Sequence, residues 1–139
     1  MKLLLDTNVI LDVFARREPW FEDSAAVLSL LDTEGFEGVA AAHSITTLFY
    51  LTSKHLGQRR ATARILDLLK LLSVAPVDQE TILKGLALGW PDFEDALQLL
   101  CAEAASADYL VTRNPRDFES DSVPVVTPSE LLAILQSEG

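Results

Sequence analysis

The stretch that decides the fold is Leu3-Leu4-Leu5-Asp6-Thr7-Asn8, in which three apolar residues end abruptly in a carboxylate, a hydroxyl and an amide. A short apolar run bounded by polar residues is typical of an interior strand of a parallel sheet. Asp6 then stands where this strand ends, and ligands of open α/β sheets bind at that end. Asp is also a common N-cap, so two interpretations stay open: Asp6 takes part in chemistry, or it only caps the following helix.

Outward from this stretch, short apolar segments alternate with helical patterns along the whole chain. We expect strands near residues 2–5, 38–42, 74–77, 108–112 and 124–127. Helical patterns lie near residues 9–15, 20–33, 44–56, 59–72, 79–89, 93–106 and 128–137. The alternation predicts one α/β domain over residues 1–139, a three-layer sandwich in which helices cover both faces of a five-stranded parallel sheet.

The composition is that of a globular domain. The chain has 139 residues, of which 49% are apolar, so it can bury a core and disorder is not expected. We find no signal-peptide pattern and no apolar run near the roughly 20 residues that span a bilayer, and we therefore expect a cytoplasmic protein without membrane contact. Cys101 is the single cysteine, which excludes an internal disulfide and a cysteine-based zinc site.

The charge restricts how this chain could meet nucleic acid. Its formal net charge is −10, from 21 acidic and 11 basic side chains, whereas nucleic-acid-binding proteins usually carry a basic surface. Such a chain must concentrate positive charge locally or recruit metal cations between carboxylates and phosphates. Basic clusters occur at Arg16-Arg17, at Arg59-Arg60 with Arg64, and at Arg113 with Arg116, although such clusters are more often ordinary solvated surface.

A second acidic cluster, Asp92, Glu94 and Asp95, falls at the start of the helical pattern over residues 93–106. Capping explains Asp92, and the helix dipole favours acidic groups in a first turn by about 0.3–1 kcal/mol each. Three close carboxylates also repel one another, and a metal cation would relieve that repulsion.

A third cluster follows the strand predicted near residues 108–112, which ends in Thr112 and Asn114 with Asp117 shortly after. Asp117 could merely close a turn. If this strand neighbours the first one, however, the polar residues of all three clusters meet at one sheet edge. Those residues are Asp6, Asn8, Glu94, Asp95, Thr112, Asn114 and Asp117. Converging carboxylates without matching basic partners are typical of a Mg²⁺ or Mn²⁺ site.

Together and in this order, residues 4–12, 93–97 and 107–118 resemble PIN domains, and more narrowly the small single-domain PIN proteins related to VapC toxins. The resemblance covers essentially the whole chain. It implies a parallel sheet with strand order 3-2-1-4-5, an acidic pocket at the strand carboxyl ends and metal-dependent endoribonuclease activity. It also implies an RNA substrate, a small antitoxin as partner and a homodimer.

Carried over residue by residue, the resemblance implies that Asp6, Asp95 and Asp117 are catalytic and bind Mg²⁺ or Mn²⁺. Asn8 and Thr112 would order these carboxylates, and Asn114 would lie beside Asp117. Two arginines, Arg113 and Arg116, could hold the RNA backbone.

One departure concerns the helix predicted after the second strand, over residues 44–56. PIN nucleases usually carry a glutamate one turn into this helix, where Thr47 stands if Ser44 is the N-cap. The pocket then lacks one charge and one ligand, unless Glu94 substitutes. His43 is a candidate general base, although a lone histidine near a helix start is more often structural.

Two other functions remain open on the sequence. The chain could be a weakened PIN fold that acts as an interaction module, which Thr47 and the acidic surface both favour. A phosphoaspartate phosphatase with Asp6 as nucleophile is less well supported, because that motif needs a second aspartate where Asn8 stands.

Overall fold

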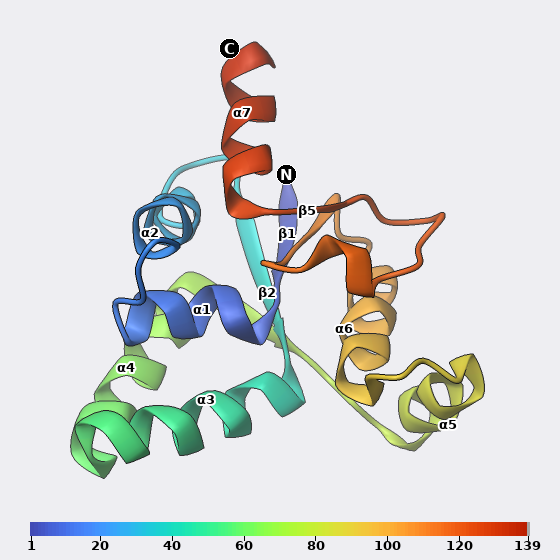
Figure 1. Ribbon diagram of the computed structural model, residues 1–139, viewed down its shortest axis with the longest axis horizontal. Helices are drawn as coiled ribbons and strands as arrows, with labels where there is room; N and C mark the ends of the chain where they lie inside the picture. The colour runs from blue at the N-terminus through green and yellow to red at the C-terminus, as the bar shows by residue number, and fades with distance from the viewer. Residues whose placement is uncertain (139) are drawn as a thin grey trace.

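The computed structural model describes residues 1–138, which form a five-stranded parallel sheet with helices on both faces (Figure 1). The strand order β3-β2-β1-β4-β5 confirms the predicted 3-2-1-4-5 arrangement. The strands are β1 (Lys2–Leu5), β2 (Glu37–Ala41), β3 (Leu72–Ala75), β4 (Tyr109–Val111) and β5 (Val125–Val126). The helices are α1 (Thr7–Phe14), α2 (Phe21–Leu30), α3 (Ala42–Leu56), α4 (Gln58–Leu71), α5 (Gln79–Leu88), α6 (Phe93–Ala104) and α7 (Pro128–Glu138).

The side-chain alternation of β1 separates the core into two layers. Leu3 and Leu5 pack with apolar residues of α1, α2, α3, α4 and α7, whereas Leu4 packs on the opposite face against α6. All three leucines are fully buried. This burial on both faces is what a continuous apolar run in a central parallel strand predicts.

Every predicted helix and strand is present, with shifts at some boundaries. The clearest shift is in α3, whose N-cap is Ala41 rather than Ser44, so the prediction that Ser44 caps this helix is wrong. Ser44 lies within the first turn and Thr47 one turn further along, because the helix begins directly where β2 ends. The 3-10 turn over Pro115–Asp117 was not predicted. No helix within residues 1–138 has the length and apolar character needed to cross a bilayer.

The pairing of β1 with β4 positions the polar residues that follow these strands. Leu5 is in register with Val111, and the Asp6 N–H donates to the Val111 carbonyl at 2.9 Å. Asp6 and Thr112 therefore leave neighbouring strands side by side at the carboxyl edge of the sheet.

Candidate active site

Asp6 serves as a helix cap and also faces the edge of the sheet where the strands end. It is the N-cap of α1, where one carboxylate oxygen accepts a hydrogen bond from the Thr7 N–H at 2.7 Å. The other oxygen accepts a hydrogen bond from the Thr112 hydroxyl at 2.7 Å. Asp6 is 6% exposed, and burial raises the pKa of its carboxyl group although both hydrogen bonds act to lower it. The two interpretations of Asp6 are thus compatible, since capping holds the carboxylate in one orientation.

A cavity of about 260 Å³ opens at this edge of the sheet, between the starts of α1 and α6. All seven polar residues that the sequence places together line it: Asp6, Asn8, Glu94, Asp95, Thr112, Asn114 and Asp117. The cavity wall also includes Leu51 from α3 and Gln98 from α6. The convergence of three separate segments is therefore a feature of the structure, whatever chemistry it supports.

The cavity concentrates negative charge without an internal cation. Burial, followed by the carboxylates of Asp6, Asp92 and Asp117, raises the pKa of Asp95 to about 7. None of the ion pairs formed within residues 1–138 involves a carboxylate of this cavity. A cation from outside the chain would remove both the repulsion and the pKa shift.

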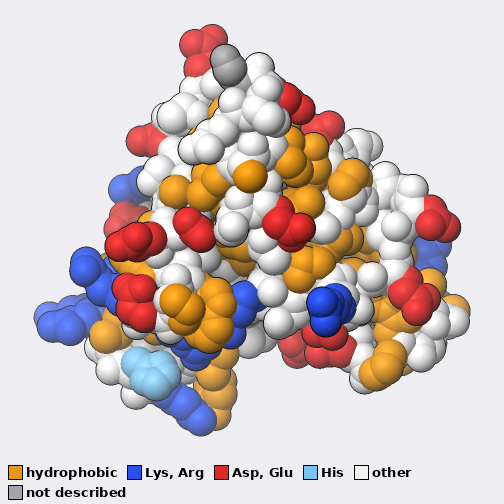
Figure 2. All heavy atoms as spheres, turned by 45° about the horizontal axis from the view of Figure 1, so that its top comes forward, with side chains coloured by type: hydrophobic (Ala, Val, Ile, Leu, Met, Phe, Trp, Pro, Cys, Tyr) orange, Lys and Arg blue, Asp and Glu red, His pale blue; other side chains and the backbone are white. Residues whose placement is uncertain are grey.

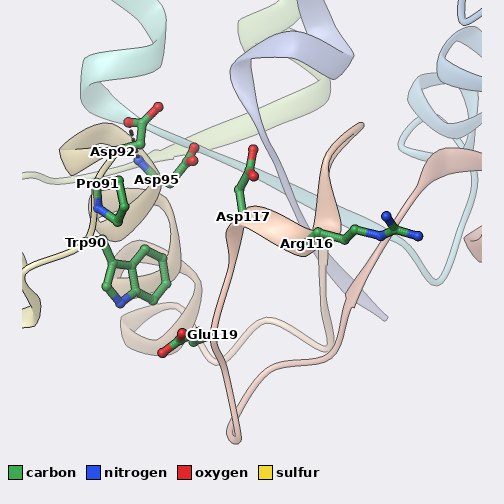
Figure 3. A pocket seen from close by; sticks show the side chains of 7 residues that line it. All are labelled: Trp90, Pro91, Asp92, Asp95, Arg116, Asp117 and Glu119. Carbon is green, nitrogen blue, oxygen red and sulfur yellow. Dashed lines mark hydrogen bonds between the residues drawn. The ribbon is translucent and has the colours of Figure 1, made fainter.

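A second hollow of about 410 Å³ adjoins this cavity and shares Asp92, Asp95 and Asp117 with it (Figure 3). Trp90 and Glu119 form its other end. In Figure 3, Asp95 and Asp117 project into the same space from α6 and the 3-10 turn, whereas Arg116 extends away from them. The acidic surface is therefore an open trough rather than a closed chamber.

Arg113 is committed elsewhere in the structure. Its guanidinium makes two hydrogen bonds to the buried Asp12 carboxylate, at 2.6 and 3.0 Å, and lies 3.8 Å from the centre of the Trp20 ring. Its backbone N–H donates to the Asn8 side-chain oxygen at 3.2 Å. The Arg113 side chain thus points away from the acidic cavity, into a cluster with α1.

Thr47 does not line the cavity. Its hydroxyl donates back to the carbonyl of His43 in the preceding turn of α3, at 3.2 Å. Burial lowers the pKa of His43, and within residues 1–138 neither of its ring nitrogens has a hydrogen-bond partner.

A buried polar network that sequence reasoning missed lies where α3 meets the cavity. Gln98 Nε2 donates to the Ser44 hydroxyl at 2.7 Å and to the Thr7 hydroxyl at 3.2 Å, and these two hydroxyls lie 2.8 Å apart. Gln98 is 1% exposed, and its Oε1 has no hydrogen-bond partner within the described chain. The available signal was spacing, since Gln98 follows Asp95 by three residues and so shares its helical face.

The donors of the cavity fit a hard divalent cation in chemistry, because they are carboxylate, amide and hydroxyl oxygens. They are not gathered as a finished ligand set: within residues 1–138, no three His, Cys, Asp or Glu side chains are arranged to hold an ion as they stand. Binding would therefore require the carboxylates of α6 and the 3-10 turn to turn inward toward Asp6.

Comparison with known proteins gives consistent results. The PIN domain family model matches residues 2–116. Ribonuclease VapC1 from Aquifex aeolicus (strain VF5) is 27% identical over 134 residues, which cover 93% of this chain and 92% of that protein. VapBC2 from Rickettsia felis, solved bound to a DNA fragment from its promoter, superposes with a TM-score of 0.70 at 18% identity, covering 90% of this chain and 97% of that one. A toxin–antitoxin complex from Klebsiella pneumoniae superposes with a TM-score of 0.68 at 21% identity, covering 91% of this chain and 97% of that one.

Proposed function

This chain belongs to the PIN domain family, and on that premise we propose that it is a metal-dependent endoribonuclease and the toxin of a toxin–antitoxin pair. The observation that carries the proposal is the cavity at the strand carboxyl ends, which brings the buried Asp6 and the half-buried Asp95 together with the exposed Glu94 and Asp117 and has no cation of its own within the described chain. The relative named ribonuclease VapC1, similar over nearly the full length of both chains, supports the choice of reaction.

In this proposal Asp6, Asp95 and Asp117 are catalytic and hold one or two Mg²⁺ or Mn²⁺ ions, with Glu94 as a further ligand. A bound ion would supply a water of lowered pKa and would stabilise charge on the scissile phosphate. The Thr112 hydroxyl and the Thr7 N–H keep the Asp6 carboxylate in a fixed orientation, so Asp6 itself needs little reorganisation on binding, whereas Asp95 and Asp117 have to turn toward it. No nucleophilic side chain is required.

The remaining polar residues have positioning roles. Asn8 accepts the Arg113 N–H and so ties the end of β4 to α1, while Asn114 donates its N–H to the Thr112 hydroxyl that supports Asp6. Arg116 borders the acidic trough, and in this proposal it contacts the RNA backbone near the mouth of the trough. Arg113 contributes less to RNA in this proposal, because its guanidinium already pairs with Asp12.

The proposed partners are an RNA substrate, a second copy of this chain and a small antitoxin. The antitoxin is supported by the fold, which this chain shares with toxins solved in toxin–antitoxin complexes. A short open reading frame beside the gene, whose product copurifies with this chain and blocks RNA cleavage, is the expected observation.

The test of activity is cleavage of a structured RNA by the natural protein and by Asp6→Asn, each with Mg²⁺, with Mn²⁺ and with EDTA. We expect weak cleavage that prefers Mn²⁺, because few anionic ligands hold Mg²⁺ poorly, and none with Asp6→Asn. Equal cleavage by both proteins would identify a contaminating nuclease and contradict the catalytic proposal.

A second candidate is an interaction module without catalysis, which is favoured by Thr47, a neutral residue at the position where the family resemblance leads us to expect a glutamate. This alternative would be supported if the natural protein cleaved no RNA with either metal, and if the natural protein and Asp6→Asn bound the antitoxin equally well.

A further inference from the structure

The basic side chains of this acidic protein are concentrated on one part of the surface. Residues 38–66, which run from β2 through α3 into α4, contain none of the 21 acidic residues. They do contain four of the 11 Lys and Arg residues, namely Lys54, Arg59, Arg60 and Arg64, and both histidines. The rest of the chain therefore carries all of the negative charge, and the α3–α4 hairpin is a positive surface on a protein of net charge −10.

These four cations form what we call the basic hairpin surface. All four are exposed, and none takes part in an ion pair within residues 1–138, although Lys2, Arg17, Lys70, Lys84 and Arg113 do. In Figure 2, Lys and Arg side chains gather around a histidine at the lower left, the side on which α3 and α4 lie in Figure 1, while most Asp and Glu side chains lie elsewhere.

Helix stability does not account for this charge. Arg59 and Arg60 stand in the first turn of α4, where the helix dipole favours acidic residues and opposes cations. This turn has no acidic residue and no side-chain cap, since its N-cap is Gly57. The arrangement raises the local positive potential at a cost to the isolated helix, and a bound anion would offset that cost.

The basic hairpin surface continues from the wall of the acidic cavity. Leu51 of α3 lines the cavity, and Lys54 follows it by three residues, which is about 4.5 Å along a helix. Lys54 lies over the exposed ring of Tyr50, with its Nζ 4.6 Å from the ring centre, so a flat apolar face stands beside the first cation. A single-stranded nucleic acid fits this arrangement, because its phosphates are regularly spaced anions and its bases can stack on an aromatic ring.

We propose that the basic hairpin surface, together with the Tyr50 ring beside Lys54, binds the RNA backbone on one side of the cleavage site. The inference rests on the proposed ribonuclease function and adds the path that the substrate takes across the protein. RNA phosphates that leave the cavity along α3 meet cations within one helical turn. This path explains how so acidic a chain holds a polyanion.

The test separates binding from cleavage. Binding of a fluorescent single-stranded RNA is measured by anisotropy in EDTA with Asp6→Asn protein, so that no cleavage is needed. Added to this background, Arg59→Gln with Arg60→Gln should weaken binding about tenfold at low salt. The slope of log Kd against log salt should fall by about 1.4, because each phosphate contact on a single strand contributes about 0.7.

A charge-matched control is Lys70→Gln with Lys84→Gln, which removes two exposed lysines that pair with acidic neighbours outside residues 38–66. We expect this control to bind RNA like the parent. Equal weakening by both double variants would mean that only net charge matters, and it would overturn the proposal. An unchanged salt slope for the arginine pair would do the same.

A protein partner is the competing occupant, and a polyglutamate peptide serves as its probe. Polyglutamate binding that depends on Arg59 and Arg60, with RNA binding unaffected, would also overturn the proposal. Because the assay needs no metal and no turnover, arginine-dependent RNA binding would stand even if cleavage were never observed. Conversely, if the arginine substitutions left RNA binding unchanged but Asp6→Asn abolished cleavage, the proposed ribonuclease function would stand and the proposed RNA path would fail.

Discussion

Two aspartates near opposite ends of α1, Asp6 and Asp12, illustrate two ways in which a folded chain holds a buried carboxylate. Asp12 is fully buried, and both oxygens of its carboxylate accept hydrogen bonds from the guanidinium of Arg113. The guanidinium of Arg17 lies 3.9 Å from the same carboxylate. Asp6 is 6% exposed and receives only a hydroxyl and a backbone N–H, while its other neighbours are carboxylates.

The difference separates a structural carboxylate from one with functional potential. A buried charge that is paired internally contributes to the fold and leaves nothing for a ligand to satisfy. A buried charge among like charges raises the pKa values around it and favours an external cation. Burial and residue type are the same in both, so the neighbouring charges decide between the two roles.

The largest effect is expected from removing the cation that Asp12 depends on. Arg113→Met should lower the free energy of unfolding by about 3–5 kcal/mol, because it removes both hydrogen bonds from the buried Asp12 carboxylate and leaves only Arg17, 3.9 Å away. Urea denaturation measures this loss. The matched control is Arg116→Met, an exposed arginine that makes no ion pair within residues 1–138, and its effect should stay within about 0.5 kcal/mol. Similar losses for both variants would contradict the contrast between the two regions.

The next effect concerns Asp6, for which the partner must come from solution. In EDTA, Asp6→Asn should be about as stable as the natural protein, because Asn also caps helices well and the change relieves repulsion. Saturating Mn²⁺, at about 100 times its Kd, should stabilise the natural protein by about 2.7 kcal/mol and Asp6→Asn far less. Thermal melting with and without Mn²⁺ measures both. Identical curves for the natural protein in the two conditions would count against a metal site.

A smaller effect is the pH dependence that Asp95 confers. Its folded-state pKa of about 7 lies above the ordinary value of 3.8, so between about pH 4 and 7 the folded protein binds more protons than the unfolded chain does. This group's contribution to stability is therefore full below about pH 4 and is lost as the pH rises toward 7.

The measurement is the melting temperature against pH in EDTA. The natural protein should lose stability relative to Asp95→Asn across this window, and the difference should shrink with Mn²⁺ because metal binding favours the deprotonated carboxylate. Parallel pH profiles for the two proteins in EDTA would show that Asp95 is not perturbed.

The sequence predicted the fold well for a physical reason that residues 3–8 illustrate. A strand buried on both faces needs an uninterrupted apolar run, and polar residues must follow where it reaches the sheet edge. The ends of two strands and the acidic start of one helix predicted that Asp6, Asp95 and Asp117 converge at one end of the sheet, and all three line the cavity there. Their catalytic roles remain a prediction.

Contacts that depend on side-chain direction could not be predicted in this way. Arg113 follows the same strand as Thr112, yet it turns toward Asp12 and Trp20, and no spacing rule links residues 101 positions apart. The contacts of Ser44 with Thr7 and Gln98 depend on where α3 starts, and the predicted N-cap, Ser44, lies three residues beyond the observed one, Ala41.

The smallest effect tests whether the metal site proposed around Asp6 lacks one further carboxylate ligand. Thr47→Glu places a carboxylate where PIN nucleases usually carry one, and we expect Mn²⁺ to bind a few times more tightly and RNA cleavage to rise. Because α3 begins at Ala42, Glu at position 47 cannot complete a capping box, so any gain has to come through the metal and not through the helix. Calorimetric titration with Mn²⁺ measures the affinity, and Thr46→Glu, on the exposed side of the same turn, is the control.

If Glu94 already supplies the missing ligand, another carboxylate adds only repulsion, and activity should fall instead. A decrease with Thr47→Glu but not with Thr46→Glu would thus assign the fourth acidic position to Glu94.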